Sequence, residues 1–99
     1  MDSIKPRELR DRAGVLKVFD IRKDPGDRQI PDSIRAEGEA LQAGQVLPFA
    51  KEDEVVLYCG SGNSCSRIAK ELRDRGYRVV ALEGGYRGWV EAGLPTEER

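Results

Sequence analysis

Residues 55–67 read VVLYCGSGNSCSR, an apolar run that ends in a cysteine and leads through small polar residues to a second cysteine. The strand that we predict over residues 54–58 is almost wholly apolar, as is typical of a parallel strand with helices on both faces of its sheet. Apolar residues then recur at helical spacing, and this spacing predicts an amphipathic helix over residues 66–75. A strand, a glycine-rich loop and a helix in this order indicate an α/β fold.

The rest of the chain continues this alternation of strands and helices. We predict a helix over residues 6–12, a strand over 15–20, an edge segment over 30–34, a helix over 36–43, a strand over 78–82 and a last short helix that includes Trp89 and Val90. Because strands alternate with helices, we expect parallel pairing through right-handed crossovers. The predicted fold is an α/β three-layer sandwich, a small parallel sheet with helices on both faces, in a single domain over residues 1–99.

Charge and hydropathy exclude several classes of partner. The chain has 17 basic and 18 acidic residues, so its net charge gives no attraction to nucleic acid or to an anionic membrane. Its apolar runs are far shorter than the roughly 20 residues that cross a bilayer, and residues 1–6 contain no apolar signal core. We therefore expect a cytoplasmic monomer.

The sequence contains two cysteines, Cys59 and Cys65, and no histidine. In a chain without a secretory signal, we expect these thiols to be reduced or redox-active rather than a structural disulfide. A zinc site built from thiolates and imidazoles is excluded, because the chain has neither histidine nor a Cys-x-x-Cys pair. We predict no metal and no cofactor.

Cys59 lies where the predicted strand 54–58 ends, and ligands of open parallel sheets bind beyond this end of the strands. The loop 60–64 is rich in glycine and small polar residues, so successive backbone N–H groups can turn inward, and the following helix adds its positive N-terminal end. Such donors favour a thiolate and would make Cys59 nucleophilic without a histidine base. The alternative is an inert, buried cysteine that only fills space; from the residues alone, both interpretations stay open.

Four segments in the same order resemble the single-domain rhodanese family. Residues 18–22 (VFDIR) resemble its early strand ending in Asp-x-Arg, and residues 30–34 (IPDSI) resemble its Ile-Pro-Gly-Ala segment. Residues 56–63 resemble its active-site strand and loop, and residues 82–95, with Leu-Glu-Gly-Gly, Trp89 and Gly-Leu-Pro, resemble its C-terminal signature.

This resemblance implies a sulfurtransferase that carries sulfane sulfur as a Cys59 persulfide. The donor would be thiosulfate, polysulfide or a protein persulfide, and the acceptor would be a thiol or another thiophilic group. The substrate-binding residues implied by the loop are Gly60, Ser61, Gly62, Asn63, Ser64 and Cys65. Near the site we expect Asp20 and Arg22 to form a structural element, held by hydrogen bonds or as an ion pair.

Two positions depart from the family pattern. Many members have an arginine at the fifth position after the cysteine, where this chain has Ser64. A hydroxyl supplies no charge, and charge-assisted hydrogen bonds are roughly twice as strong as neutral ones, so we expect thiosulfate to be a poor donor. Arg67 either compensates for this loss or is a solvated helix residue.

Cys65 is the second departure, since the family commonly has serine or threonine there. It is either a tolerated small residue or a resolving thiol. As a resolving thiol, it would attack a persulfide or sulfenic acid on Cys59 and close a disulfide.

Two alternatives to sulfur transfer remain open. One is a non-catalytic rhodanese-like module that binds a protein partner. The other is a phosphatase-like or arsenate-reductase-like enzyme with a Cys59/Cys65 redox pair; such enzymes need an arginine at the position of Cys65, which favours sulfur transfer over this chemistry.

Overall fold

A five-stranded parallel sheet forms the centre of the computed structural model, which describes residues 2–44 and 47–99. The strands follow the order β1-β6-β5-β2-β4 across the sheet. Their bounds are β1 (Ser3–Ile4), β2 (Lys17–Asp20), β4 (Ile34–Arg35), β5 (Glu54–Tyr58) and β6 (Arg78–Leu82). Every pair of neighbours in this sheet is parallel, as the sequence predicts.

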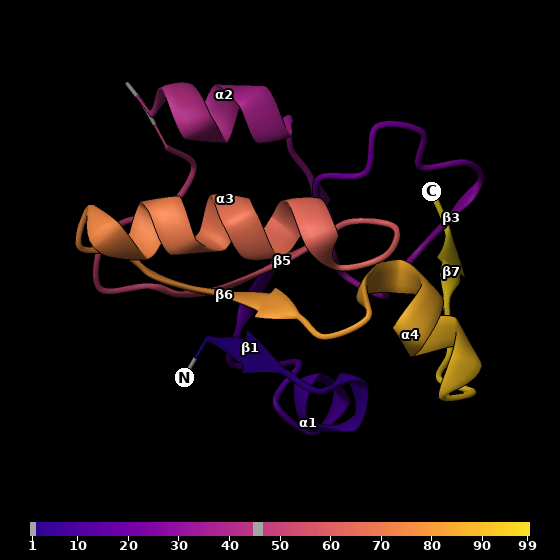
Figure 1. The fold of residues 1–99 in the computed structure, drawn as a ribbon. Helices are drawn as coiled ribbons and strands as arrows, with labels where there is room; N and C mark the ends of the chain where they lie inside the picture. The colour runs from indigo at the N-terminus through magenta and orange to yellow at the C-terminus, as the bar shows by residue number, and fades with distance from the viewer. Residues whose placement is uncertain (1, 45–46) are drawn as a thin grey trace.

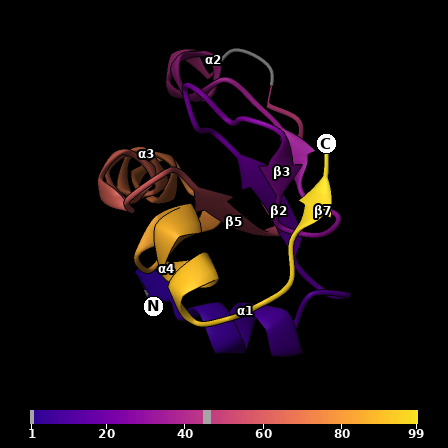
Figure 2. The ribbon, with the colours of Figure 1, turned by 90° about the vertical axis from the view of Figure 1, so that its right-hand side faces the viewer.

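Helices cover both faces of the sheet, and each face has its own apolar core. The helices α2 (Gly38–Ala43) and α3 (Asn63–Asp74) lie on one face, and α1 (Pro6–Asp11) and α4 (Gly85–Glu91) lie on the other (Figures 1 and 2). Leu72 of α3 is fully buried in the first core, while Leu9 of α1 and Trp89 of α4 are buried in the second. The predicted α/β three-layer sandwich is therefore confirmed.

A small antiparallel pair, absent from the sequence-based expectations, lies beside the main sheet. Strand β3 (Arg28–Gln29) pairs with β7 (Glu97–Glu98) close to the C-terminus. Gln29 Nε2 also donates a 2.7 Å hydrogen bond to Glu97. This pairing ties the last residues of the chain to the loop that follows β2.

Five predicted elements have different bounds in the structure; the helices predicted over residues 6–12 and 36–43 are observed as Pro6–Asp11 and Gly38–Ala43. The strand predicted over residues 15–20 begins only at Lys17; Val15 is 71% exposed, because the chain turns there with Val15 N and Leu16 N bonded to Arg12 O. The helix predicted from Ser66 begins at Asn63, since Gly62 with φ 99° turns the chain into it. The predicted edge segment 30–34 contributes only its last residue to β4.

The order of the strands places β5 at the centre of the sheet and aligns its end with that of β2. Asp20 of β2 lies opposite Tyr58 of β5, and Ile21 N continues the ladder with a bond to Tyr58 O. The residues after both strands therefore emerge side by side. Within the described ranges, no helix has the length and apolarity needed to cross a membrane.

Candidate active site

Cys59 follows β5 directly, and its sulfur lies against the first turn of α3. Cys59 Sγ accepts hydrogen bonds from Gly62 N at 3.1 Å and from Cys65 N at 3.4 Å. Cys65 Sγ lies 3.3 Å from the same sulfur, and its thiol is the donor of this hydrogen bond when Cys59 is a thiolate. The backbone donors that the sequence predicts around Cys59 are therefore in place.

These donors stabilise the thiolate form of Cys59. The hydrogen bond from the Cys65 thiol lowers the pKa of Cys59 to about 5; burial acts in the opposite direction, and the N–H groups of Cys65, Gly62 and Ser61 add to the lowering. The hydrogen bond to Cys59 and burial raise the pKa of Cys65. At neutral pH the pair thus consists of one thiolate and one neutral thiol, and the thiolate is the nucleophile.

The N-terminus of α4 holds the active-site loop from behind. Tyr86 N donates to Cys59 O at 2.7 Å, and Arg87 N donates to Gly60 O at 3.0 Å. With these two carbonyls bound by α4, the N–H groups of the loop are free to face the sulfur.

This contact requires Gly85 for steric reasons. Gly85 has φ 60°, and a Cβ there would lie 2.5 Å from Cys59 O and 2.7 Å from Gly62 N. From the sequence, Gly84 and Gly85 are expected only to allow a tight strand-to-helix turn. The role of Gly85 depends on a neighbour 23 or more residues earlier in the chain, which no local pattern reveals.

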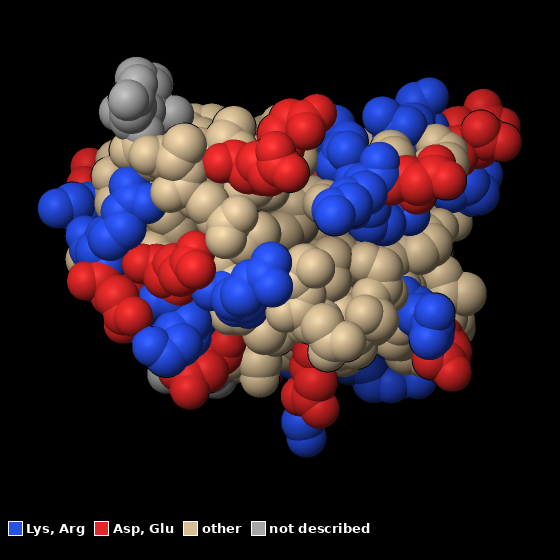
Figure 3. Space-filling model, turned by 45° about the horizontal axis from the view of Figure 1, so that its top comes forward, with Lys and Arg blue, Asp and Glu red and all other residues tan. Residues whose placement is uncertain are grey.

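A cavity of about 620 Å³ opens above Cys59. Its charged lining residues are the cations Arg22, Lys23, Arg35 and Arg67 and the anions Asp24, Glu37 and Glu39. Lys and Arg side chains accordingly alternate with Asp and Glu side chains on the face that carries α2 and α3 (Figure 3). The cavity is polar and of mixed charge, with a slight excess of cations.

The residues predicted to bind substrate occupy three different positions. Gly60, Ser61 and Ser64 line the cavity. Gly62 and Cys65 are buried and contact Cys59 Sγ instead. Asn63, the first residue of α3, is exposed and is not part of the cavity lining, so its predicted binding role has no support in the geometry.

Comparison with known proteins agrees with this fold. The model of the rhodanese-like domain family matches residues 5–92. The chain belongs to the rhodanese-like family. A protein of Allochromatium vinosum named "Sulfurtransferase" is 34% identical over 92 residues, which are 90% of this chain and 84% of that protein.

Two further relatives show how much of a longer protein this rhodanese-like domain matches and which fold it shares. The Synechocystis protein "Uncharacterized protein slr1261" is 43% identical over 91% of this chain, which spans only 51% of that protein's length. The crystal structure of a rhodanese-related protein from Thermoplasma volcanium has a TM-score of 0.86, covers 98% of both chains and is 23% identical. This last similarity shows the fold.

Asp20 and Arg22 form the predicted ion pair beside the site of the rhodanese-like domain. Arg22 Nη2 lies 2.7 Å from Asp20 Oδ2, and both side chains are buried. The guanidinium also stacks 4.0 Å from the centre of the Tyr86 ring and donates to Arg28 O. Arg22 therefore joins the end of β2, the start of β3 and the start of α4.

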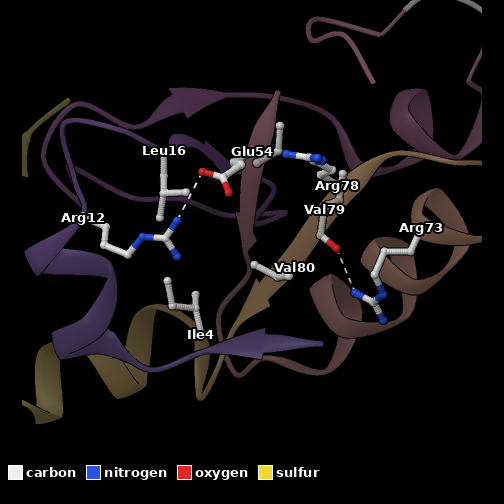
Figure 4. A pocket seen from close by; sticks show the side chains of 9 residues that line it. Ile4, Arg12, Leu16, Glu54, Arg73, Arg78, Val79 and Val80 are labelled. Carbon is white, nitrogen blue, oxygen red and sulfur yellow. Dashed lines mark hydrogen bonds and ion pairs between the residues drawn. The ribbon is translucent and has the colours of Figure 1, made fainter. Parts of the chain in front are cut away.

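A second hollow, of about 360 Å³, lies at the opposite ends of β5 and β6 (Figure 4). Ile4 and Val80 give it an apolar part, and two of its three arginines have partners: Arg12 pairs with Glu54 at 3.2 Å, and Arg73 donates to Val79 O at 2.9 Å. No cysteine lines this hollow. Cys59 lines the larger cavity at the other ends of these strands.

Proposed function

We propose that this rhodanese-like domain is a sulfurtransferase that carries sulfane sulfur as a persulfide on Cys59. The observation that carries the proposal is the position of Cys59 Sγ, which lies at the base of an open cavity and accepts hydrogen bonds from Gly62 N and Cys65 N. The name of the Allochromatium vinosum relative supports the same activity.

The first half-reaction loads the enzyme with sulfur. The Cys59 thiolate attacks the outer sulfur of the donor, a new S–S bond forms, and the bond between the donor's own sulfurs breaks. Its electron pair leaves with sulfite when the donor is thiosulfate, and with a shorter polysulfide or a protein thiolate for the other donors. A low pKa keeps Cys59 in the attacking form at neutral pH.

In the second half-reaction, an acceptor thiolate attacks the outer sulfur and Cys59 leaves as a thiolate. The N–H groups of Gly62 and Cys65 are already directed at the sulfur on which this charge develops. Donors that are positioned before the reaction stabilise developing charge without reorganisation. A thiol of low pKa is also a good leaving group.

The cavity favours a donor other than free thiosulfate. Ser64 lines it where many rhodaneses have an arginine, and a hydroxyl provides only a neutral hydrogen bond. Arg67, one helical turn beyond Asn63, is the remaining cation of α3 in the lining. We infer that polysulfide or a protein persulfide loads Cys59 faster than thiosulfate does.

The alternative oxyanion chemistry has less support in the geometry. A phosphatase-like or arsenate-reductase-like site would need an arginine at position 65 pointing to the substrate. Position 65 is instead a cysteine that is fully buried behind Cys59. A binding module without catalysis would not require a thiolate at the base of its cavity.

The test is the intact mass of the reduced protein after incubation with thiosulfate or with inorganic polysulfide. We expect Cys65→Ser to gain the mass of one sulfur atom and Cys59→Ser to gain none, with more complete loading by polysulfide. No gain in Cys65→Ser with either donor would contradict sulfur transfer and leave a binding module as the better explanation.

A further inference from the structure

The active site contains a second sulfur in contact with the first. Cys65 Sγ lies 3.3 Å from Cys59 Sγ, and the two cysteines are free thiols. Cys65 is 0% exposed and contacts no part of the cavity, whereas Cys59 lines it. A donor therefore reaches Cys59 from the cavity, and Cys65 approaches it from the protein interior.

A thiol at position 65 does more than donate a hydrogen bond. A serine hydroxyl would donate to the Cys59 thiolate as well, since hydroxyls are stronger donors than thiols. Only a sulfur can also form a covalent bond with Cys59 under mild conditions. A disulfide requires about 2.05 Å between the sulfurs, so the two must approach by roughly 1.3 Å from their present 3.3 Å.

We infer that Cys65 is a resolving thiol, which displaces the outer sulfur of the Cys59 persulfide as hydrogen sulfide and closes a Cys59–Cys65 disulfide. This inference rests on the proposed function, because it starts from the loaded enzyme. It adds an activity to sulfur transfer, namely the reductive release of sulfide at the expense of an external dithiol.

The step is balanced in atoms and electrons. Cys65 Sγ forms a bond to Cys59 Sγ, the bond between Cys59 Sγ and the outer sulfur breaks, and the electron pair leaves with the outer sulfur. The outer sulfur takes up the proton of the Cys65 thiol and is reduced to hydrogen sulfide, while Cys65 is oxidised. An external dithiol then supplies two electrons and two protons, which restore both cysteines and leave the dithiol as its own disulfide.

The geometry suits this displacement. Thiol–disulfide exchange proceeds by attack of a thiolate on one sulfur of an S–S bond. The outer sulfur can extend only into the cavity, since the other sides of Cys59 Sγ face Gly62 N, Cys65 N and the Cys65 thiol. Cys65 therefore lies on the side of Cys59 away from the leaving sulfur.

Loading also prepares Cys65 to react. In the resting enzyme, the hydrogen bond to the Cys59 thiolate raises the pKa of Cys65, so that Cys65 keeps its proton. In the persulfide, the negative charge resides on the outer sulfur and no longer on Cys59 Sγ. Loading therefore removes the largest cause of the raised pKa of Cys65, while the thiol keeps Gly62 O as an acceptor at 3.4 Å.

The test is a single turnover of the full chain without any acceptor. Wild type, Cys65→Ser and Cys59→Ser are reduced, freed of reductant without air and mixed with thiosulfate or with inorganic polysulfide. Intact mass and peptide mapping detect the persulfide and the disulfide. Released sulfide is measured only in the samples with thiosulfate, and the sulfide released with Cys59→Ser is subtracted as background. A sample without donor controls for oxidation by air.

We expect wild type to lose two hydrogens through a Cys59–Cys65 disulfide and, with thiosulfate, to release one sulfide for each disulfide formed. Cys65→Ser should keep the added sulfur and release no sulfide. Dithiothreitol also removes sulfur directly from loaded Cys65→Ser, and the rate of this reaction is the background. With dithiothreitol present, wild type should release sulfide faster than this background.

A wild type that keeps the added sulfur as fully as Cys65→Ser, with no disulfide, would overturn the inference and leave sulfur transfer intact. No added sulfur in Cys65→Ser and no disulfide in wild type would overturn both. A disulfide that forms equally fast without donor would also overturn the inference, because it would show oxidation that is independent of the persulfide.

Discussion

Arg22 Nη2 lies 2.7 Å from Asp20 Oδ2, and the two side chains are only 9% and 1% exposed. Asp20 also accepts hydrogen bonds from Arg22 N and Arg22 Nε. The pair lies at the end of β2, next to the end of β5 that leads into Cys59. Its charges are thus neutralised within the protein interior, close to the nucleophile but without contact to its sulfur.

Removing one member of this pair should strongly destabilise the fold. Asp20→Ala leaves the buried guanidinium of Arg22 without its carboxylate, and breaking a buried ion pair in this way costs about 3–5 kcal/mol. We expect a loss of this size in urea unfolding. Asp74→Ala is the control, because it breaks the exposed pair with Lys70 and should cost less than about 1 kcal/mol. Equal losses of unfolding free energy in Asp20→Ala and Asp74→Ala would contradict a stabilising role of the buried Asp20–Arg22 pair.

Alkylation should report the low pKa of Cys59. The rate with iodoacetamide should reach half of its plateau near pH 5, where the pKa lies. Cys65→Ala removes the largest cause of the shift and should move this half-point to higher pH, whereas Cys65→Ser keeps a donor and should move it less. A half-point that is the same in Cys65→Ala as in wild type would rule out the Cys65 thiol as the main cause.

The same thiolate links stability to pH. The pKa of Cys59 is lower in the folded chain than in the unfolded one, where a cysteine titrates near about 8.5. Its contribution is therefore fully present above about pH 8.5 and is lost as the pH falls through about 5. The free energy of unfolding should rise from pH 5 to 8.5 more steeply for wild type than for Cys59→Ser. Parallel profiles for the two proteins would contradict the lowered pKa.

Gly85 should be indispensable for the shape of the loop. Gly85→Ala introduces a Cβ within 3 Å of three backbone atoms of the loop, at Cys59, Gly60 and Gly62. We expect a loss of about 1–3 kcal/mol from this crowding, in addition to backbone strain, and slower alkylation of Cys59. Gly93→Ala is the matched control, since Gly93 also has a positive φ of 75° but open space around it. If Gly85→Ala and Gly93→Ala lose the same unfolding free energy, the close approach of residue 85 to the loop does not contribute to the loss.

A charge at position 64 should improve the use of thiosulfate. Ser64→Arg adds a charge-assisted hydrogen bond at the cavity, worth about 1.5–3 kcal/mol, so kcat/KM for thiosulfate should rise by roughly tenfold or more. Arg67→Gln should lower it. Lys70→Gln on the exposed side of α3, where Lys70 pairs with Asp74, should leave it unchanged. An effect of Lys70→Gln as large as that of Arg67→Gln would indicate general attraction of anions rather than binding in the cavity.

The longer elements were predictable from the sequence because their patterns are local. The apolar run 54–58 and the helical periodicity that ends at Gly76 gave the right type of element. Two-residue strands carry no periodicity, which is why β1, β3 and β7 had no counterpart in the predictions. Apolar character alone extended the predicted strand to Val15, which the backbone turn after α1 leaves exposed.

The backbone N–H donors around Cys59 Sγ were predictable for the same reason, whereas the remaining parts of the site were not. Ser61 and Gly62 follow Cys59 closely in sequence, so the hydrogen bonds of their N–H groups to the sulfur follow from the loop itself. Arg35 and Gly85 reach the site only through the order of the strands and the docking of α4. Asn63 was assigned to substrate binding from its place in the loop, but it begins α3 and is exposed.

The order of the strands places the nucleophile Cys59 on the most firmly held strand and the opposite side of the cavity on peripheral elements. Cys59 extends the central strand β5, which is paired on both sides, whereas the facing wall of the cavity comes from the two-residue edge strand β4, the loop after β2 and the six-residue helix α2. Peripheral segments with few buried contacts open locally at low free energy, whereas central strands open only on global unfolding. Substitutions in these peripheral elements therefore change the donor specificity over evolutionary time without moving the Cys59 sulfur.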